Sequence, residues 1–92
     1  MVLTIAGSDS GGGSGLQADL RTFAAQSVHG VCALTVVSSQ NTEEFRSALA
    51  IPAPVVRSQI EAVLDDFEVK VAKTGLLYSE ENIRLISEMA DV

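Results

Sequence analysis

Hydrophobic residues follow two kinds of pattern along the chain, continuous runs and runs at helical spacing. Continuous apolar or β-branched runs at residues 2–6 and 31–37 predict buried strands, and residues 69–74 predict a further strand. Apolar residues three or four positions apart at 16–24, 55–64 and 83–89 predict three amphipathic helices. A short edge strand is predicted over 47–51, and polar residues at 38–44 predict a turn.

Two helix starts carry additional signals. Pro54 lies at the start of the second helix, where its missing N–H costs nothing. Ser79 is a candidate N-cap, and Glu80 and Glu81 follow it in the first turn of the last helix. Strands and helices therefore alternate, which predicts an α/β protein with an open, mostly parallel sheet and helices on both faces.

The length sets a limit on this architecture. A parallel sheet of three or four strands leaves an apolar edge uncovered, which favours self-association into a homo-oligomer. We therefore expect residues 1–92 to be a single, incomplete domain, the N-terminal portion of a longer protein.

Composition excludes several functional classes. The chain is 47% hydrophobic with a mean hydropathy of +0.29, which excludes intrinsic disorder. Its net charge of −6 is the opposite of what binding to nucleic acid or to an anionic membrane requires. A single cysteine excludes an internal disulfide and a zinc site built from several thiolates, and we expect no metal site. The chain shows no leader pattern and no apolar stretch of membrane-spanning length, so we expect a cytoplasmic protein.

The segment 7–15 holds five of the seven glycines and carries the clearest functional signal. No lysine occurs before Lys70, so the segment is not a Walker A loop, and Asp9 stands where a nucleophile elbow needs serine. Residues 13–18 match the Gly-x-Gly-x-x-Ala pattern of dinucleotide-binding proteins. However, Ser38 and Ser39 occupy the place of the acidic residue expected after the second strand. A nicotinamide-dependent oxidoreductase and a flexible loop without a ligand remain as alternatives.

Residues 5–23 resemble the N-terminal signature of the hydroxymethylpyrimidine kinase / phosphomethylpyrimidine kinase family of thiamine biosynthesis. Ser-Gln-Asn-Thr at 39–42, Ile-Pro at 51–52 and Lys-Thr-Gly-Leu-Leu at 73–77 also fit the family, in the same order and spacing. Two departures are Ser14, where alanine is usual, and Leu76, where methionine is usual. The resemblance covers nearly the whole chain.

The resemblance implies a ribokinase-like fold and ATP-dependent phosphorylation, with Mg²⁺, of 4-amino-5-hydroxymethyl-2-methylpyrimidine and then of its monophosphate. Ligands of open parallel sheets bind beyond the carboxyl ends of the strands, where Gly7, Gln40 and Gly75 are predicted to lie. The substrate-binding residues implied by the family are Ala6, Gly7, Gly12, Gly13, Asp19, Gln40 and Leu76.

Three of these residues have a chemical reason for a binding role beside an ordinary structural one. The amide of Gln40 offers a donor and an acceptor to the edge of an aminopyrimidine, or it belongs to an ordinary turn. Asp19 accepts from a substrate hydroxyl or amino group, or it is a solvated helix charge. Leu76 forms an apolar wall against the ring, or it is plain core. Lys73 ends a strand and is expected to lie near phosphate, but the sequence assigns it no role.

The family places its anion-hole glycines, its catalytic residue and most of its ATP contacts late in the chain. Only Gly30 and Gly75 follow the first loop, so we expect the catalytic residues beyond Val92 and no phosphoryl transfer by residues 1–92 alone. A pyridoxal kinase of the same superfamily and a non-catalytic small-molecule sensor that reuses the pocket are the alternative functions.

Overall fold

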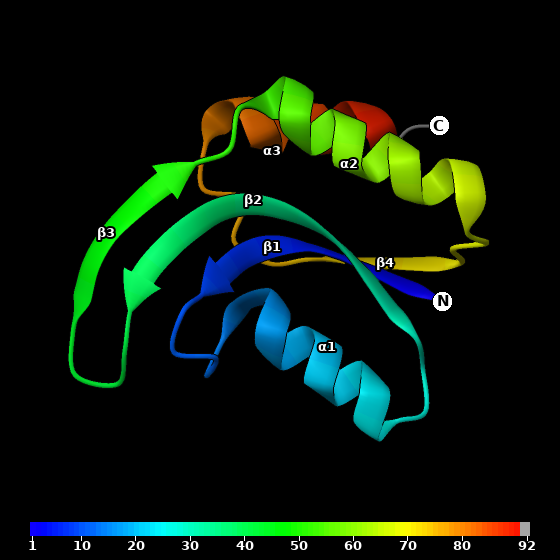
Figure 1. Ribbon diagram of the computed structural model, residues 1–92. Helices are drawn as coiled ribbons and strands as arrows, with labels where there is room; N and C mark the ends of the chain where they lie inside the picture. Colours follow the sequence, from blue (N-terminus) through cyan, green and yellow to red (C-terminus); the bar gives the residue numbers. More distant parts are fainter. Residues whose placement is uncertain (91–92) are drawn as a thin grey trace.

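The computed structural model describes residues 1–90, which form four strands and three helices (Figure 1). The elements in chain order are β1 (Val2–Asp9), α1 (Gly15–Ala25), β2 (Gly30–Gln40), β3 (Phe45–Ala50), α2 (Ala53–Asp66), β4 (Val71–Thr74) and α3 (Glu80–Ala90). None of the described helices is long and apolar enough to cross a membrane. The predicted α/β class is confirmed.

The four strands form one sheet in the order β3-β2-β1-β4. β1 runs parallel to both β2 and β4, whereas β3 turns back and pairs antiparallel with β2. Val2 pairs with Gly30 on one side and with Val71 on the other, so the first strand lies between its two neighbours. This is the mostly parallel open sheet that the order of elements predicts.

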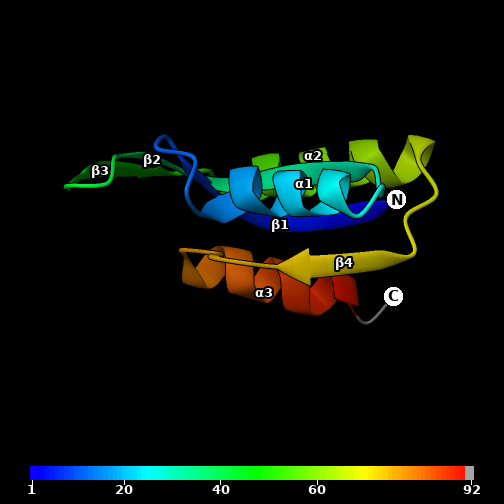
Figure 2. The same ribbon diagram turned by 90° about the horizontal axis from the view of Figure 1, so that it is seen from below.

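The helices lie on both faces of the sheet. α1 covers one face, and α2 and α3 lie together on the other (Figures 1 and 2). The main core lies beneath α2 and α3, because alternate residues of the central strands point toward these helices. It consists of Leu3, Ile5, Ala33, Val56, Ile60 and Leu85. Because β1, β2 and β4 run parallel, their carboxyl ends lie together at the end of the sheet away from the N-terminus.

The first two strands extend further than the sequence predicts. β1 continues through Gly7 to Asp9, so the glycine-rich loop is shorter than 7–15. β2 continues to Gln40, which corrects the predicted turn over 38–44. The cause is tertiary pairing: Asp9 pairs with Ser38, and Ser39 pairs with Ser47 of the returning β3. Polar side chains at these positions therefore mark a strand end rather than a turn.

Smaller corrections concern the other elements. β3 begins at Phe45, two residues earlier than predicted, and β4 begins at Val71 rather than at residue 69. The predicted cap of the last helix is confirmed, because the backbone N–H of Asn82 donates to Ser79 Oγ at 3.1 Å. Asn82 itself is fully buried and donates from Nδ2 to the carbonyl of Leu77 at 3.1 Å. This contact joins the loop after β4 to the start of α3.

A side chain from α2 completes the hydrogen bonding of β2 where β3 does not reach. β3 pairs with β2 only from Val36 onward, which leaves the outer flank of Leu34 without a strand neighbour. The Gln59 amide fills this place: its Oε1 accepts from the Leu34 N–H at 2.8 Å, and its Nε2 donates to the Leu34 carbonyl at 2.9 Å. One side chain therefore acts as a local strand partner.

Replacing Gln59 with leucine should destabilise the fold, because it leaves the Leu34 N–H and carbonyl unpaired in a half-buried place. Each unpaired group costs about 1–3 kcal/mol. Urea unfolding followed by circular dichroism measures the loss in free energy of unfolding. Ser58→Ala, on an exposed position of the same helix, is the control and should stay within about 0.5 kcal/mol of the parent. Equal stability of Gln59→Leu and the parent would contradict this role.

Candidate functional site

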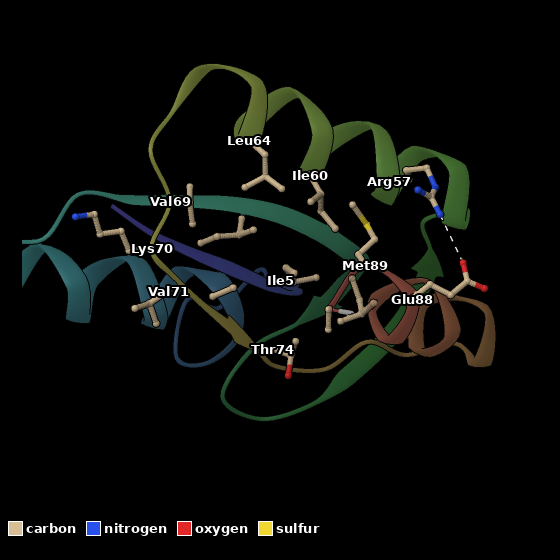
Figure 3. Close-up of a pocket in the computed structure, with 14 residues that line it drawn as sticks. Ile5, Arg57, Ile60, Leu64, Val69, Lys70, Val71, Thr74, Glu88 and Met89 are labelled. Carbon is tan, nitrogen blue, oxygen red and sulfur yellow. Dashed lines mark ion pairs between the residues drawn. The ribbon is translucent and has the colours of Figure 1, made fainter. Parts of the chain in front are cut away.

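An apolar groove of about 560 Å³ lies between α2, α3 and the outer edge of β4 (Figure 3). Its floor and walls are formed by apolar side chains such as Ile60, Leu64 and Met89. An ion pair between Arg57 and Glu88, with 3.7 Å between Nη2 and Oε2, lies at one end. The groove lacks converging polar groups, which a small-molecule site uses to orient its ligand.

A different hollow, a cavity of about 270 Å³, lies at the carboxyl ends of the three parallel strands. This is the place where open α/β sheets bind ligands. We call it the strand-end cavity. It is lined by Ala6, Gly7, Ser8, Asp9, Ser14, Gly15, Val36, Ser38, Gln40, Phe45, Ala48, Lys73, Gly75, Leu76 and Tyr78.

The Asp9 carboxylate holds the glycine-rich loop in shape. Its Oδ1 accepts from the Gly11 amide at 2.8 Å, and its Oδ2 accepts from the amide and the hydroxyl of Ser14 at 2.9 and 2.8 Å. These hydrogen bonds, led by that from the Ser14 hydroxyl, hold the pKa of Asp9 below its usual value. The carboxylate is therefore ionised at neutral pH, and it is occupied by its own loop.

Two glycines in this loop adopt the left-handed conformation, Gly12 with φ 75° and Gly15 with φ 65°. They differ in their surroundings. A Cβ on Gly12 would meet only Arg21 Nη1 at 3.5 Å, whereas a Cβ on Gly15 would overlap the carbonyl oxygen of Gly7. The close packing of α1 on the end of β1 therefore requires glycine at position 15.

Gln40 reaches the strand-end cavity at the end of β2 and is fixed by a chain of hydrogen bonds. Its Nε2 donates to Ser38 Oγ at 2.8 Å, and the Ser38 hydroxyl donates to the carbonyl of Ser8. The backbone N–H of Gln40 donates to Ser10 Oγ at 2.7 Å. No donor within residues 1–90 occupies Gln40 Oε1. The amide is thus oriented, with its acceptor oxygen uncommitted.

A cluster of charged and polar side chains connects α1 to β4. Lys73 Nζ lies 2.8 Å from both carboxylate oxygens of Asp19, and Thr4 Oγ1 donates to Asp19 Oδ2 at 2.7 Å. Burial raises the pKa of the Asp19 carboxyl, but the hydrogen bonds from Lys73 and Thr4 outweigh it and leave the pKa below its usual value. The Asp19 carboxylate is therefore ionised at neutral pH.

The structure brings four of the seven sequence-predicted residues into the lining of the strand-end cavity: Ala6, Gly7, Gln40 and Leu76. Gly7 lies within β1 rather than after it, and Gln40 is the last residue of β2. Gly75 follows β4, so all three positions meet at one cavity as predicted. Gly12, Gly13 and Asp19 lie outside the lining.

Sequence reasoning missed other lining residues and gave one of them no role. Ser38 was assigned to a turn, and Phe45 belongs to a strand that was predicted to begin later. Tyr78 lines the cavity with a positive φ of 73°, which no local pattern signals for tyrosine. Lys73 had a usable signal, because it precedes Gly75 at the end of a predicted strand. Within residues 1–90, no three His, Cys, Asp or Glu side chains gather closely enough to hold a metal ion.

Comparison with known proteins identifies the family. The family model for phosphomethylpyrimidine kinase matches residues 9–92. The chain belongs to the phosphomethylpyrimidine kinase family. It is 46% identical over 89 residues to the hydroxymethylpyrimidine/phosphomethylpyrimidine kinase of Streptomyces coelicolor, and 49% identical over 87 residues to that of Synechococcus elongatus. These alignments cover 97% and 95% of the chain. The chain spans only 33% of the length of each of these relatives.

Solved structures show the same ribokinase-like fold. The phosphomethylpyrimidine kinase of Clostridium difficile superposes with a TM-score of 0.94 at 40% identity, over 98% of this chain and 39% of that one. The pyridoxal kinase of Bacillus subtilis, solved with ADP, gives a TM-score of 0.89 at 37% identity over 98% and 36%. The pyridoxal kinase of Staphylococcus aureus, in complex with AMP-PCP and pyridoxal, superposes with a TM-score of 0.85 at 36% identity. The match covers 98% of this chain and 34% of that one.

Proposed function

We propose that residues 1–90 form the pyrimidine-binding part of a kinase that phosphorylates 4-amino-5-hydroxymethyl-2-methylpyrimidine and then its monophosphate, using ATP. The observation that carries this proposal is the oriented Gln40 amide at the strand-end cavity. Its fixed Nε2 leaves Oε1 as an acceptor for the exocyclic amino group of an aminopyrimidine. The names of the relatives, which are hydroxymethylpyrimidine/phosphomethylpyrimidine kinases, support the same substrate.

The remaining walls suit a small aromatic ring. Ala6 and Gly7 bring backbone to the floor of the cavity, and Leu76 adds an apolar side chain that is 62% exposed. Such exposure of a large apolar side chain at a cavity favours burial against a ligand. Gly12 contributes through its left-handed backbone, which shapes the loop, and Asp19 contributes through Lys73, whereas Gly13 lies outside the cavity lining.

Residues 1–90 do not by themselves fit the binding of Mg²⁺. The two carboxylates nearest the cavity are already occupied, Asp9 by the Gly11 and Ser14 donors and Asp19 by Lys73 and Thr4. Neither carboxylate is therefore free to hold Mg²⁺. In the proposed kinase, ATP and Mg²⁺ are held by other parts of the fold.

Pyridoxal phosphorylation is the second candidate, because the pyridoxal kinases of Bacillus subtilis and Staphylococcus aureus are also similar in structure to this chain. The two substrates differ at the ring edge: the aminopyrimidine presents an amino donor, whereas pyridoxal presents a phenolic oxygen and an aldehyde. Because Gln40 Oε1 has no hydrogen-bond donor among residues 1–90, it favours a ligand with a donor at this edge, which is the aminopyrimidine.

Isothermal titration calorimetry of the purified protein with both ligands separates the candidates. We expect the aminopyrimidine to bind more tightly than pyridoxal. Tighter binding of pyridoxal would replace the proposed substrate, and binding of neither ligand would contradict the assignment of the cavity.

Replacing Gln40 with alanine should weaken binding of the aminopyrimidine about five- to a hundredfold, because a buried hydrogen bond to the ligand is lost. Calorimetric Kd values measure the change. Ser39→Ala is the matched control, because Ser39 is exposed on the same strand and lies outside the cavity lining. If both variants bind like the parent, Gln40 does not contact the ring.

A further inference from the structure

Lys73 is the single cationic side chain among the residues that line the strand-end cavity. It stands on β4 beside Thr4 of β1, and its ammonium is close to the Gly75 backbone, since a Cβ on Gly75 would lie 3.7 Å from Nζ. Its side chain is 49% exposed, whereas that of Asp19 is only 16% exposed. The ammonium thus lies between a half-buried carboxylate on one side and open space on the other.

The hydrogen-bond partners of Lys73 leave part of its capacity unused. An ammonium group has three N–H donors, and both recorded contacts of Lys73 Nζ go to the one carboxylate of Asp19. The other charged lining residue, Asp9, is turned into its own loop and does not compete. A further acceptor that enters the cavity can therefore reach the exposed side of the ammonium.

The chemistry of the proposed reaction gives this arrangement a use. The kinase must accept an uncharged alcohol and then a phosphomonoester with a charge of about −1.5 to −2 at pH 7. An isolated lysine would favour the anion, and its burial by the neutral ligand would be costly. With Asp19 beside it, Lys73 is compensated when the alcohol is bound and can also bind a phosphate oxygen.

We propose that Lys73, held in place by Asp19, binds the phosphate group of a phosphomonoester ligand and so determines acceptance of the phosphorylated substrate. This inference rests on the proposed function, since it concerns the same cavity and its second substrate. Lysine binds phosphate as a point charge, through charge-assisted hydrogen bonds that are stronger than neutral ones. Asp19 is a positioning residue in this scheme.

The test compares the Kd of the aminopyrimidine alcohol with that of its phosphomonoester in the purified protein and in Lys73→Met. We expect the substitution to weaken binding of the phosphomonoester about ten- to a hundredfold and to leave binding of the alcohol unchanged. In the parent, added salt should weaken binding of the phosphomonoester but not of the alcohol. This salt dependence of the Kd should be smaller in Lys73→Met. Lys73→Arg should restore part of the affinity.

Two further variants separate this role from a purely structural one. Lys70→Met removes the same charge from an exposed lysine outside the strand-end cavity and should leave both Kd values unchanged. Asp19→Asn/Lys73→Met leaves no unpaired carboxylate, so it keeps the test valid if Lys73→Met alone unfolds. If a folded Lys73 variant loses affinity equally for both ligands, or loses affinity for neither, the inference is overturned. Failure of the parent to bind either ligand would overturn the proposed function instead.

Discussion

Replacing Gly15 with alanine is expected to abolish ligand binding at the strand-end cavity. Gly15 has φ 65°, and its missing side chain is what allows the first turn of α1 to lie against the Gly7 carbonyl. The left-handed conformation alone costs alanine about 1–2 kcal/mol. The overlap with Gly7 adds a displacement of β1 or α1, which changes the cavity itself. Calorimetry with the aminopyrimidine should show no measurable binding.

Gly13→Ala is the matched control for this prediction. Gly13 lies in the same loop, but its φ is outside the left-handed region and an added Cβ would meet only Asp9 Oδ2, at 3.8 Å. The Gly13→Ala variant should therefore bind the ligand nearly as well as the parent. If Gly15→Ala also binds normally while remaining folded, the contact between α1 and β1 does not define the cavity.

Substituting Val71 with glutamate is expected to reduce self-association of the 92-residue chain strongly. Val71 is 60% exposed on the outer strand β4 and lines the apolar groove, where strand and helix surfaces remain uncovered (Figure 3). Exposed edges and apolar grooves of this size drive association between copies. A charge at the start of this edge strand, beside the groove, opposes association. Sedimentation velocity over a range of concentrations measures the change.

The matched control is Leu49→Glu. Leu49 is 68% exposed on β3, at the opposite edge of the sheet and away from the groove. It carries the same change of an exposed apolar residue to an acid. If Leu49→Glu dissociates the oligomers and Val71→Glu does not, the association uses the β3 edge rather than the groove.

Local sequence patterns predicted the strands and helices where burial is regular. Apolar runs located the central parts of β1 and β2, because a strand covered on both faces is apolar at successive positions. Helical spacing located α1, α2 and α3, because each packs one face against the sheet. The Ser79 cap was predictable for the same reason, since its hydroxyl bonds an amide only three residues away. Of the candidate site, the expectation that strand ends converge brings Gly7 and Gln40 to the cavity, whereas Ala6 and Leu76 follow from the family resemblance; all four line it.

What sequence could not supply is contact between distant residues. Ser38 and Gln40 extend β2 because β3 returns to pair with them, and polar composition alone indicated a turn. The pairing of Asp19 with Lys73 joins a helix to a strand more than fifty residues away, and no spacing rule connects them. Gln59 is another example, since its role depends on where β3 stops along β2.

The position of β1 between β2 and β4 has a consequence for biosynthesis. The ribosome releases β1 first, and β2 can pair with it soon afterwards, because Val2 pairs with Gly30. The other flank of β1 pairs with Val71 to Thr74, so it stays open until the whole of β4 has emerged. Pairing over such a sequence separation is slow, and an open strand flank invites contact with other chains. The nascent protein is therefore most vulnerable to misassembly between the completion of β2 and the arrival of β4.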